Sequence, residues 1–125
     1  MESDYLETQY YVAKLLEGIL FVQYKPMVRI SLEDAQVIVA DRLKTFRDAH
    51  VPVMIRIGKV KSIDKEARSF LFKEGLVNIK AVALIDEHNH DSVLATFLLG
   101  VEPPSVPCKT FDDEQKATAW LRQFV

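Results

Sequence analysis

Apolar and polar positions follow two different periods along the chain, and the changes of period mark the predicted elements. Residues 10–16 and 19–24 are aromatic and β-branched, and Glu17-Gly18 separates them. This pattern predicts an antiparallel hairpin in which the glycine adopts the backbone angles of the turn. Residues 1–7 are polar, and we expect them to form a loose start.

A first long helix is predicted after Pro26, which ends the second strand of the hairpin. Ser31 followed by Asp34 is a variant of the capping box, in which both side chains bind backbone N–H groups. The helix is expected to end near Ala49. Its apolar stripe consists of Leu32, Ala35, Val39, Leu43 and Phe46.

The stretch at residues 51–87 predicts a strand, a short helix and a second strand. The strands are expected at residues 53–57 and 79–85, and the helix at residues 65–74. This βαβ unit requires a parallel sheet with a right-handed crossover. Both strands are nearly continuous apolar runs, as expected when helices cover both faces of the sheet.

The short helix has recognisable ends. Asp64 is the expected N-cap, and Gly75 is expected to adopt a left-handed conformation at the other end. Phe72 falls off the apolar face, so it is either exposed or in contact with a neighbouring segment. The buried face is expected to contain Ala67, Phe70 and Leu71.

The last third of the chain predicts one more strand between two helices. Residues 91–100 carry an apolar stripe at helical spacing, and residues 106–111 form a short strand. Pro107 within that strand indicates an edge position. Asp112-Asp113 cap the last helix. Its apolar face, which must dock on the sheet, consists of Ala117, Trp120, Leu121 and Phe124.

The predicted order is therefore β-β-α-β-α-β-α-β-α in one domain, residues 1–125. Alternating strands and helices indicate an α/β fold with helices on both faces of a mostly parallel sheet. The 125 residues include 49% apolar and 27% charged residues with a net charge of −2, which argues against a nucleic-acid-binding protein.

Several features predict a cytoplasmic location. The only cysteine, Cys108, cannot form an internal disulfide, which is compatible with a reducing compartment. The acidic N-terminal residues lack the pattern of a signal peptide, and no apolar run is long enough to span a membrane.

The hairpin with its βα repeats, the loop at residues 57–64 and the closing segment at residues 111–121 resemble SpoIIAA-like proteins. This is the fold of the sulfate-transporter and anti-sigma-factor-antagonist (STAS) domains and their uncharacterised bacterial relatives. The resemblance covers almost the whole chain in its order of elements. Its implications are the SpoIIAA-like fold and a surface that docks a partner.

In the anti-sigma-factor antagonists, the central loop ends in an aspartate followed by a phosphorylatable serine. Asp64 matches the aspartate, but Lys65 follows it, so the phosphoacceptor is missing. Ser62 does not match the family's serine. A phosphate on Ser62 would interact with nearby lysines. The alternative is that the Ser62 hydroxyl only caps the local backbone.

Basic residues surround this loop and the helix after it. They are able to face an acidic partner, an anion or a lipid head group, and the alternative is a solvated helix end. We select the loop and the helix start as the partner-binding surface, because free N–H groups lie there at the carboxyl end of a central strand. The predicted partner-binding residues are Lys59, Lys61, Ser62, Asp64, Lys65 and Arg68, with Arg56 close by.

The sharpest candidate for metal chemistry lies at residues 87–91. Its imidazole and carboxylate side chains are metal-ligand types, and the alternative is a solvated turn in which Asp91 caps a helix. We assign no metal ligand from sequence alone. The residues concerned are Glu87, His88, His90 and Asp91.

Enzyme chemistry finds little support in the sequence. Cys108 has no distinctive flanking motif, and no nucleotide-binding or serine-hydrolase motif occurs among the four glycines. A response-regulator receiver is excluded, because Tyr24-Lys25 and Gly58-Lys59 occupy the strand ends where it requires acidic residues. We expect no catalytic residue and no cofactor.

The sequence thus predicts a non-catalytic interaction or regulatory module. Its expected partner is a protein or a second copy of the chain, as in a homodimer. The alternatives are a carrier of a small apolar or anionic ligand, and a metal-dependent enzyme. An aromatic face of the hairpin is expected to belong to the core, and it comprises Tyr10, Tyr11, Phe21 and Tyr24.

Overall fold

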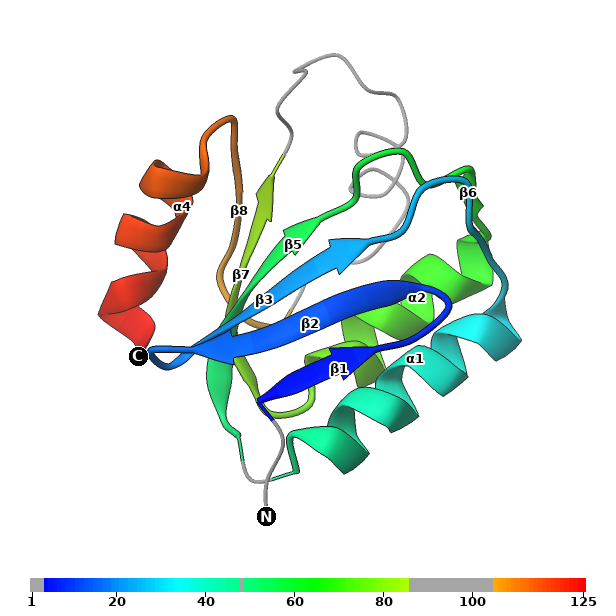
Figure 1. Cartoon of the computed structure of the whole chain (residues 1–125), viewed down its shortest axis with the longest axis horizontal. Coiled ribbons are helices and arrows are strands. Elements are labelled where there is room, and N and C mark those ends of the chain that lie inside the picture. The colour runs from blue at the N-terminus through cyan, green and yellow to red at the C-terminus, as the bar shows by residue number, and fades with distance from the viewer. Residues whose placement is uncertain (1–3, 48, 86–104) are drawn as a thin grey trace.

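A computed structural model describes residues 4–47, 49–85 and 105–125, in which one sheet lies between helices (Figure 1). The strand order is β1-β2-β3-β5-β7-β8, and a second small sheet pairs β4 with β6. The strands are β1 Tyr5–Glu7, β2 Tyr11–Leu16, β3 Ile19–Tyr24, β4 Arg29–Ile30, β5 Val51–Arg56, β6 Ser62–Ile63, β7 Ile79–Ile85 and β8 Cys108–Phe111. The helices are α1 Leu32–Thr45, α2 Lys65–Lys73 and α4 Glu114–Leu121, with 3₁₀ turns at Glu74–Leu76 and Arg122–Phe124.

The predicted fold class is confirmed. The first three strands pair antiparallel, whereas β3, β5, β7 and β8 pair parallel. α1 and α2 cover one face of the sheet, and α4 covers the other (Figure 1). The small strands β4 and β6 were not predicted, because two-residue strands leave no period in a sequence.

β5 is the central strand of the parallel part, and both of its faces are buried. Val53 belongs to the core under α1 and α2, and Met54 belongs to the core under α4. β7 alternates in the same way, with Val82 on one side and Ala83 on the other. This confirms the inference from the continuous apolar runs.

The hairpin turn has the predicted residues in the required conformation. Leu16 pairs with Ile19, and Glu17 and Gly18 have φ angles of 52° and 81°. Two positive φ angles define a type I′ turn, whose twist matches that of the flanking strands. A Cβ atom on Gly18 would lie 2.6 Å from a methyl carbon of Val125, so the last residue packs against this turn (Figure 1).

The prediction of a loose start was wrong, because Tyr5–Glu7 forms the edge strand β1. β1 pairs antiparallel with β2, and Leu6 packs against the core under α1 and α2. A single inward apolar residue between two exposed ones is too short a pattern to reveal a strand from sequence.

The aromatic residues of the hairpin do not share one face, contrary to expectation. Tyr10, Tyr11 and Tyr24 belong to the core under α1 and α2, whereas Phe21 packs on the α4 side. Successive residues of a strand point to opposite faces, so Phe21 and Tyr24 have to separate.

The capping box at the start of α1 is confirmed, and it also ties α1 to the hairpin. The Ser31 side chain accepts a hydrogen bond from the Asp34 amide, and the Asp34 carboxylate accepts from the Ser31 amide at 2.9 Å. The Tyr10 hydroxyl donates to the same carboxylate at 2.5 Å. The bond from the Ser31 backbone and the bond from Tyr10 hold the pKa of Asp34 below its ordinary value of 3.8.

Two details of α1 differ from the prediction. The helix ends at Thr45, not near Ala49. Leu32 is exposed at the first turn, whereas Ile38, which the predicted stripe omitted, is buried. Of the other members of the predicted stripe, Ala35, Val39 and Phe46 are buried as expected.

The end of α2 also differs from the prediction. Gly75 lies within the 3₁₀ turn and has no positive φ angle, whereas Asn78 has a φ of 66° and makes the left-handed bend before β7. Phe72 is buried in the core, and Phe70 and Leu71 are only partly buried. α2 packs against both α1 and the sheet, so its apolar surface is wider than one stripe.

β8 occupies the sheet edge that Pro107 indicated, and it is shorter than predicted. Asp113 caps α4 by accepting hydrogen bonds from the Gln115 and Lys116 amides. Ala117 and Leu121 of α4 are buried on the sheet, as expected. The helix predicted at residues 91–100 lies outside the described residues.

The turn yields a first prediction. Gly18→Ala should lower the free energy of unfolding by about 1 kcal/mol or more. A positive φ is unfavourable for alanine, and its methyl group would clash with Val125. Glu17→Asn should instead raise it by about 0.5 kcal/mol, because asparagine tolerates this conformation. Urea unfolding monitored by circular dichroism measures both. Equal effects of the two substitutions would contradict the turn geometry.

The capping box yields a second prediction. Asp34→Asn should destabilise the protein by on the order of 1 kcal/mol at pH 7, because it removes the charged acceptor of three hydrogen bonds, from the Ser31 amide and from the Ser31 and Tyr10 hydroxyls. Because the pKa of Asp34 is lowered in the folded protein, this stabilisation is fully present at pH values above the pKa of the unfolded state. It disappears as the pH falls through the folded-state pKa, which lies below 3.8. Chemical denaturation at several pH values measures the difference. Glu33→Gln, in the same helical turn, is the control. Its difference in stability from the wild type should not disappear in the same way at low pH.

Candidate functional site

The loops that leave β3 and β5 meet at one edge of the sheet. The two strands are parallel and in register from Leu20–Val53 to Gln23–Arg56, so their carboxyl ends lie side by side. The loops then pair again, because Arg29 of β4 lies opposite Ser62 of β6. We call residues 25–30 and 57–64 the carboxyl rim.

Backbone hydrogen bonds hold the two loops of the carboxyl rim together. The Met27 amide donates to the Lys59 carbonyl at 2.8 Å, and the Lys61 amide donates to the Val28 carbonyl at 2.8 Å. The Asp64 amide donates to the Ile30 carbonyl at 2.9 Å. The predicted partner-binding loop is therefore held in place by backbone hydrogen bonds to a second loop.

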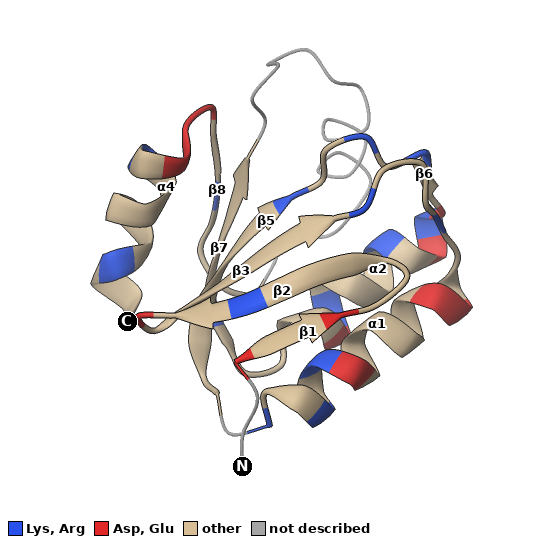
Figure 2. Cartoon of the chain, in the orientation of Figure 1, with Lys and Arg blue, Asp and Glu red and all other residues tan. Residues whose placement is uncertain are grey.

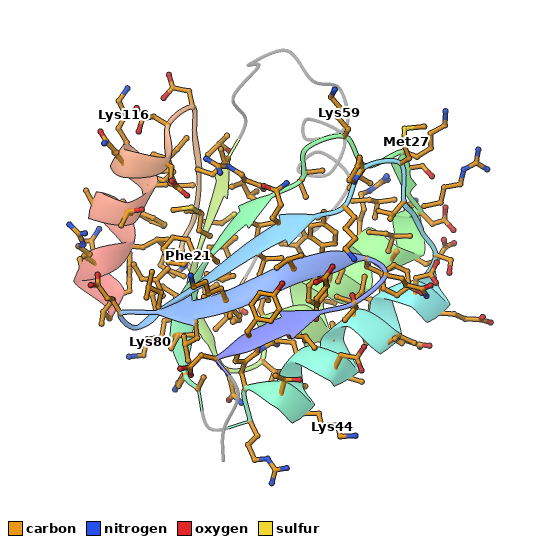
Figure 3. All side chains as sticks on the ribbon, viewed as in Figure 1. Phe21, Met27, Lys44, Lys59, Lys80 and Lys116 are labelled. Atoms are coloured by element: carbon orange, nitrogen blue, oxygen red, sulfur yellow. The ribbon has the colours of Figure 1, made fainter. Side chains whose placement is uncertain are left out.

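The predicted partner-binding residues lie together at this edge. Figure 2 shows basic residues along both loops of the carboxyl rim and at the start of α2, and Figure 3 shows Lys59 and Met27 pointing away from the sheet. The exposed members of the predicted set are Lys59, Lys61, Ser62, Asp64 and Lys65.

The two arginines of the basic set are less available. Arg68 is partly buried, and its Nη1 donates to the Ile63 carbonyl at 3.0 Å. Arg56 lies 3.7 Å from the Glu114 carboxylate of α4. Arg68 therefore stabilises the backbone of the carboxyl rim at Ile63. Arg56 forms an ion pair with α4 on the opposite face of the sheet.

The start of α2 is where the resemblance to the anti-sigma-factor antagonists implies a phosphorylatable serine. Asp64 is the N-cap residue, and Lys65 is the first helical residue. The Asp64 side chain makes no capping hydrogen bond. Lys65 carries a positive charge where a phosphorylatable hydroxyl would stand, so no phosphate ester forms there.

Sequence reasoning missed Met27. Its side chain is 64% exposed, and its φ of 66° places it in the left-handed region that favours glycine. Pro26 followed by a positive φ fits a type II turn, and the proline is the signal that was available. Met27 is therefore an exposed apolar side chain among the lysines and arginines of the carboxyl rim.

A second candidate site is a cavity of about 70 Å³ between the sheet and the helices α1 and α2. Its walls are mainly aliphatic and come from β2, β3, β5, β7 and both helices. The charged or hydroxyl-bearing residues among the lining are Tyr11, Tyr24 and Arg42.

Arg42 is the charged residue of this lining. Its Nη2 donates to the carbonyls of Gly75 at 3.1 Å and Val77 at 2.9 Å, beyond the end of α2. Burial lowers the pKa of the guanidinium. Within residues 4–47, 49–85 and 105–125, no carboxylate forms an ion pair with Arg42.

The two tyrosines of the lining differ in their hydrogen bonds. The Tyr11 hydroxyl donates to the Ile38 carbonyl at 3.2 Å. The Tyr24 side chain is only 6% exposed, and its hydroxyl has no hydrogen-bond partner in the described part of the chain. Burial raises the pKa of both, so both phenols are neutral donors.

The remaining sequence candidates contribute nothing further to these sites. Residues 87–91, the metal candidate, lie outside the described residues, and the part that is described contains no cluster of three metal-ligand side chains. Cys108 is partly buried, and burial raises the pKa of its thiol, which disfavours a reactive thiolate. No helix among the described residues is long and apolar enough to cross a membrane.

The sheet order and the helices on its two faces define a SpoIIAA-like α/β protein. The chain resembles an uncharacterized DUF3478-family protein from Shewanella loihica PV-4 with a SpoIIAA-like fold, at 16% identity and a TM-score of 0.55. The match covers 97% of this chain and 98% of the other. The predicted resemblance is thus confirmed for the fold.

The particular family follows from the sequence. The model of DUF7793, a domain of unknown function, matches residues 13–125, so the chain belongs to the DUF7793 family. No curated protein matches the chain.

The two tyrosines of the cavity yield a third prediction. Tyr11→Phe should lower the free energy of unfolding by about 1 kcal/mol, because the Ile38 carbonyl loses its donor. Tyr24→Phe should change it by less than about 0.5 kcal/mol, because the hydroxyl makes no hydrogen bond within the described residues. Denaturant unfolding of the two variants measures the contrast. An equal loss in both variants would show that the Tyr24 hydroxyl is bonded after all.

Proposed function

We propose that this protein is a non-catalytic interaction or regulatory module of STAS-like type. The observation that carries the proposal is the carboxyl rim, where two paired loops present basic side chains next to the start of α2. A fixed backbone lowers the entropy lost when a partner binds, and lysines on a surface steer an acidic partner. The expected partner is a cytoplasmic protein, or a second copy of the chain.

The proposed surface consists of the predicted residues with two refinements. Lys59, Lys61 and Lys65 supply the positive charge, and Ser62 and Asp64 supply polar contacts at the same edge. Met27 adds an exposed apolar contact, whereas Arg68 acts mainly by holding the Ile63 carbonyl. The proposal concerns recognition alone, and it invokes no reaction at the rim.

Regulation at this surface would differ from that of the antagonists. The hydroxyl that they phosphorylate is replaced by Lys65, so the partner recognises a constant positive surface. Ser62 remains a candidate for modification, since it is exposed on β6 between lysines. A phosphate there would neutralise part of the charge that the proposed partner reads.

A second candidate function is a carrier of a small molecule. The cavity beside Arg42 favours it, because an apolar chamber with a few polar groups is typical of ligand sites. The carrier and the module use different surfaces, so one protein can perform both. A bound molecule retained through purification and detected by native mass spectrometry would support the carrier.

Charge reversal at the carboxyl rim tests the module. The double variant Lys61→Glu and Lys65→Glu should capture a partner at least about tenfold less well than the wild type, because two attractive charges become repulsive. The measurement is cross-linked affinity capture from the source cell extract with quantitative mass spectrometry. Circular dichroism checks that the variant remains folded.

A matched control separates local from general charge effects. Lys44→Glu and Lys80→Glu change the net charge equally, and Figure 3 shows both lysines far from Lys59 and Met27. The control should retain the partner that the rim variant loses. Equal capture by all three proteins, or equal loss in both variants, would overturn the assignment of the rim.

A further inference from the structure

We infer that the carboxyl rim lies against an anionic lipid bilayer, with its basic side chains at the phosphate head groups and Met27 in the interface. This target goes beyond the proposed function, which assigns a protein partner to the same surface. Three observations carry the inference: basic side chains without ion pairs at one edge, an exposed apolar side chain among them, and a fixed backbone beneath both.

Four basic side chains of this edge are available for an anion. Arg29, Lys59 and Lys61 are exposed on the carboxyl rim, and Lys65 is exposed as the first residue of α2. None of the ion pairs in the described part of the chain includes them. Figure 2 shows basic residues along the edge where the two loops meet. A layer of lipid phosphates presents many anions to such an edge at once.

The charge of the molecule is divided unevenly. The carboxyl rim and the first two residues of α2 contain five basic and two acidic residues, a net charge of +3. The whole chain carries −2, so the remaining residues carry −5. An anionic bilayer attracts the basic edge and repels the acidic remainder, so the charge turns this edge toward the surface. The acidic residues of the edge are Asp64 and Glu66, and the fifth basic residue is Lys25, which pairs with Glu7 at 2.9 Å.

Met27 gives the same edge an apolar contact. Its side chain is 64% exposed, and its amide donates to the Lys59 carbonyl at 2.8 Å, so the two residues are neighbours. Figure 3 shows both side chains pointing away from the sheet. Moving an apolar side chain from water into the boundary between head groups and acyl chains is favourable. The flexible lysines around it reach the phosphates while Met27 enters that boundary.

The backbone under these side chains is fixed. Ile30 and Ile63 pair across the two loops, and both are buried. Val60, between Lys59 and Lys61, is buried as well. The loops therefore keep their apolar residues inside and their basic residues outside without any rearrangement. Little conformational entropy of the backbone is lost when the edge meets a surface.

The composition of the edge favours lipid over a protein as its target. Three of the four available basic residues are lysines, whose point charges suit mobile head groups because they need no fixed geometry. Protein interfaces are instead enriched in arginine and aromatic residues and depleted in lysine. Of the exposed large apolar side chains among the described residues, Met27 alone belongs to the carboxyl rim. An acidic polypeptide is therefore the alternative that the experiment has to separate.

Flotation of the full chain with phospholipid vesicles tests the inference. Vesicles with about equal parts of phosphatidylglycerol and phosphatidylcholine should bind the protein at least about tenfold better than vesicles of phosphatidylcholine alone. Raising the salt concentration from about 0.05 M to about 0.5 M should weaken this binding by about tenfold or more, because salt screens exposed charges.

Matched variants locate the contact. Lys59→Glu with Lys61→Glu should weaken binding to the acidic vesicles by about tenfold or more. Lys44→Glu with Lys80→Glu changes the net charge equally, away from the rim, and should weaken it by less than about threefold (Figure 3). Met27→Asn should weaken it by about threefold or more, because asparagine tolerates the positive φ but loses the apolar contact. Circular dichroism checks that each variant is folded.

Soluble polyglutamate separates the lipid from an acidic polypeptide. Binding of polyglutamate at the rim without a preference for acidic vesicles would overturn the lipid target and leave the proposed protein partner intact. Equal losses in the two double variants would overturn the rim as the lipid contact, and full vesicle binding by Met27→Asn would overturn the place of Met27 in the interface. A preference for acidic vesicles that the rim and Met27 variants lose, and the control keeps, would support the inference.

Discussion

The parallel pairing of β3 with β5 is the constraint on which the rest of this protein depends. It brings two loops to one sheet edge, where they pair again through β4 and β6. Parallel strands buried on both faces need helices on each side, and α1, α2 and α4 provide them. The same pairing thus creates the basic rim and the layered core. A chain with these residues but an antiparallel β5 would send the two loops to opposite ends of the sheet.

α2 links the two candidate surfaces. Its first residue, Lys65, lies at the carboxyl rim, and the backbone just beyond its last turn supplies the carbonyls that hold Arg42. Nine residues of helix extend over about 13 Å. α2 is therefore the short element that connects the carboxyl rim to the wall of the cavity. The buried Ala67 and Phe72 fix it against the core between these ends.

The sequence predicted the large elements well because their patterns are long. The hairpin, the parallel strands β5 and β7, the capping box of α1 and the cap of α4 all follow from local chemistry. Tertiary effects account for the errors: Leu6 forms an edge strand by pairing with β2, and Asn78 makes the bend expected at Gly75. The loop residues of the rim were selected from sequence, but Arg42 was not. Its role comes from contacts 33 and 35 residues away, which no local pattern contains.

The most direct test of the central claim is amide hydrogen exchange at the carboxyl rim, resolved by nuclear magnetic resonance. The paired loops predict strong protection of the Met27, Lys61 and Asp64 amides, because each donates to a carbonyl across the rim. Exchange of these three amides at the rate of an unstructured peptide would contradict the claim. The two loops would then be independent of each other, and the rim would lose the fixed geometry on which its proposed recognition depends.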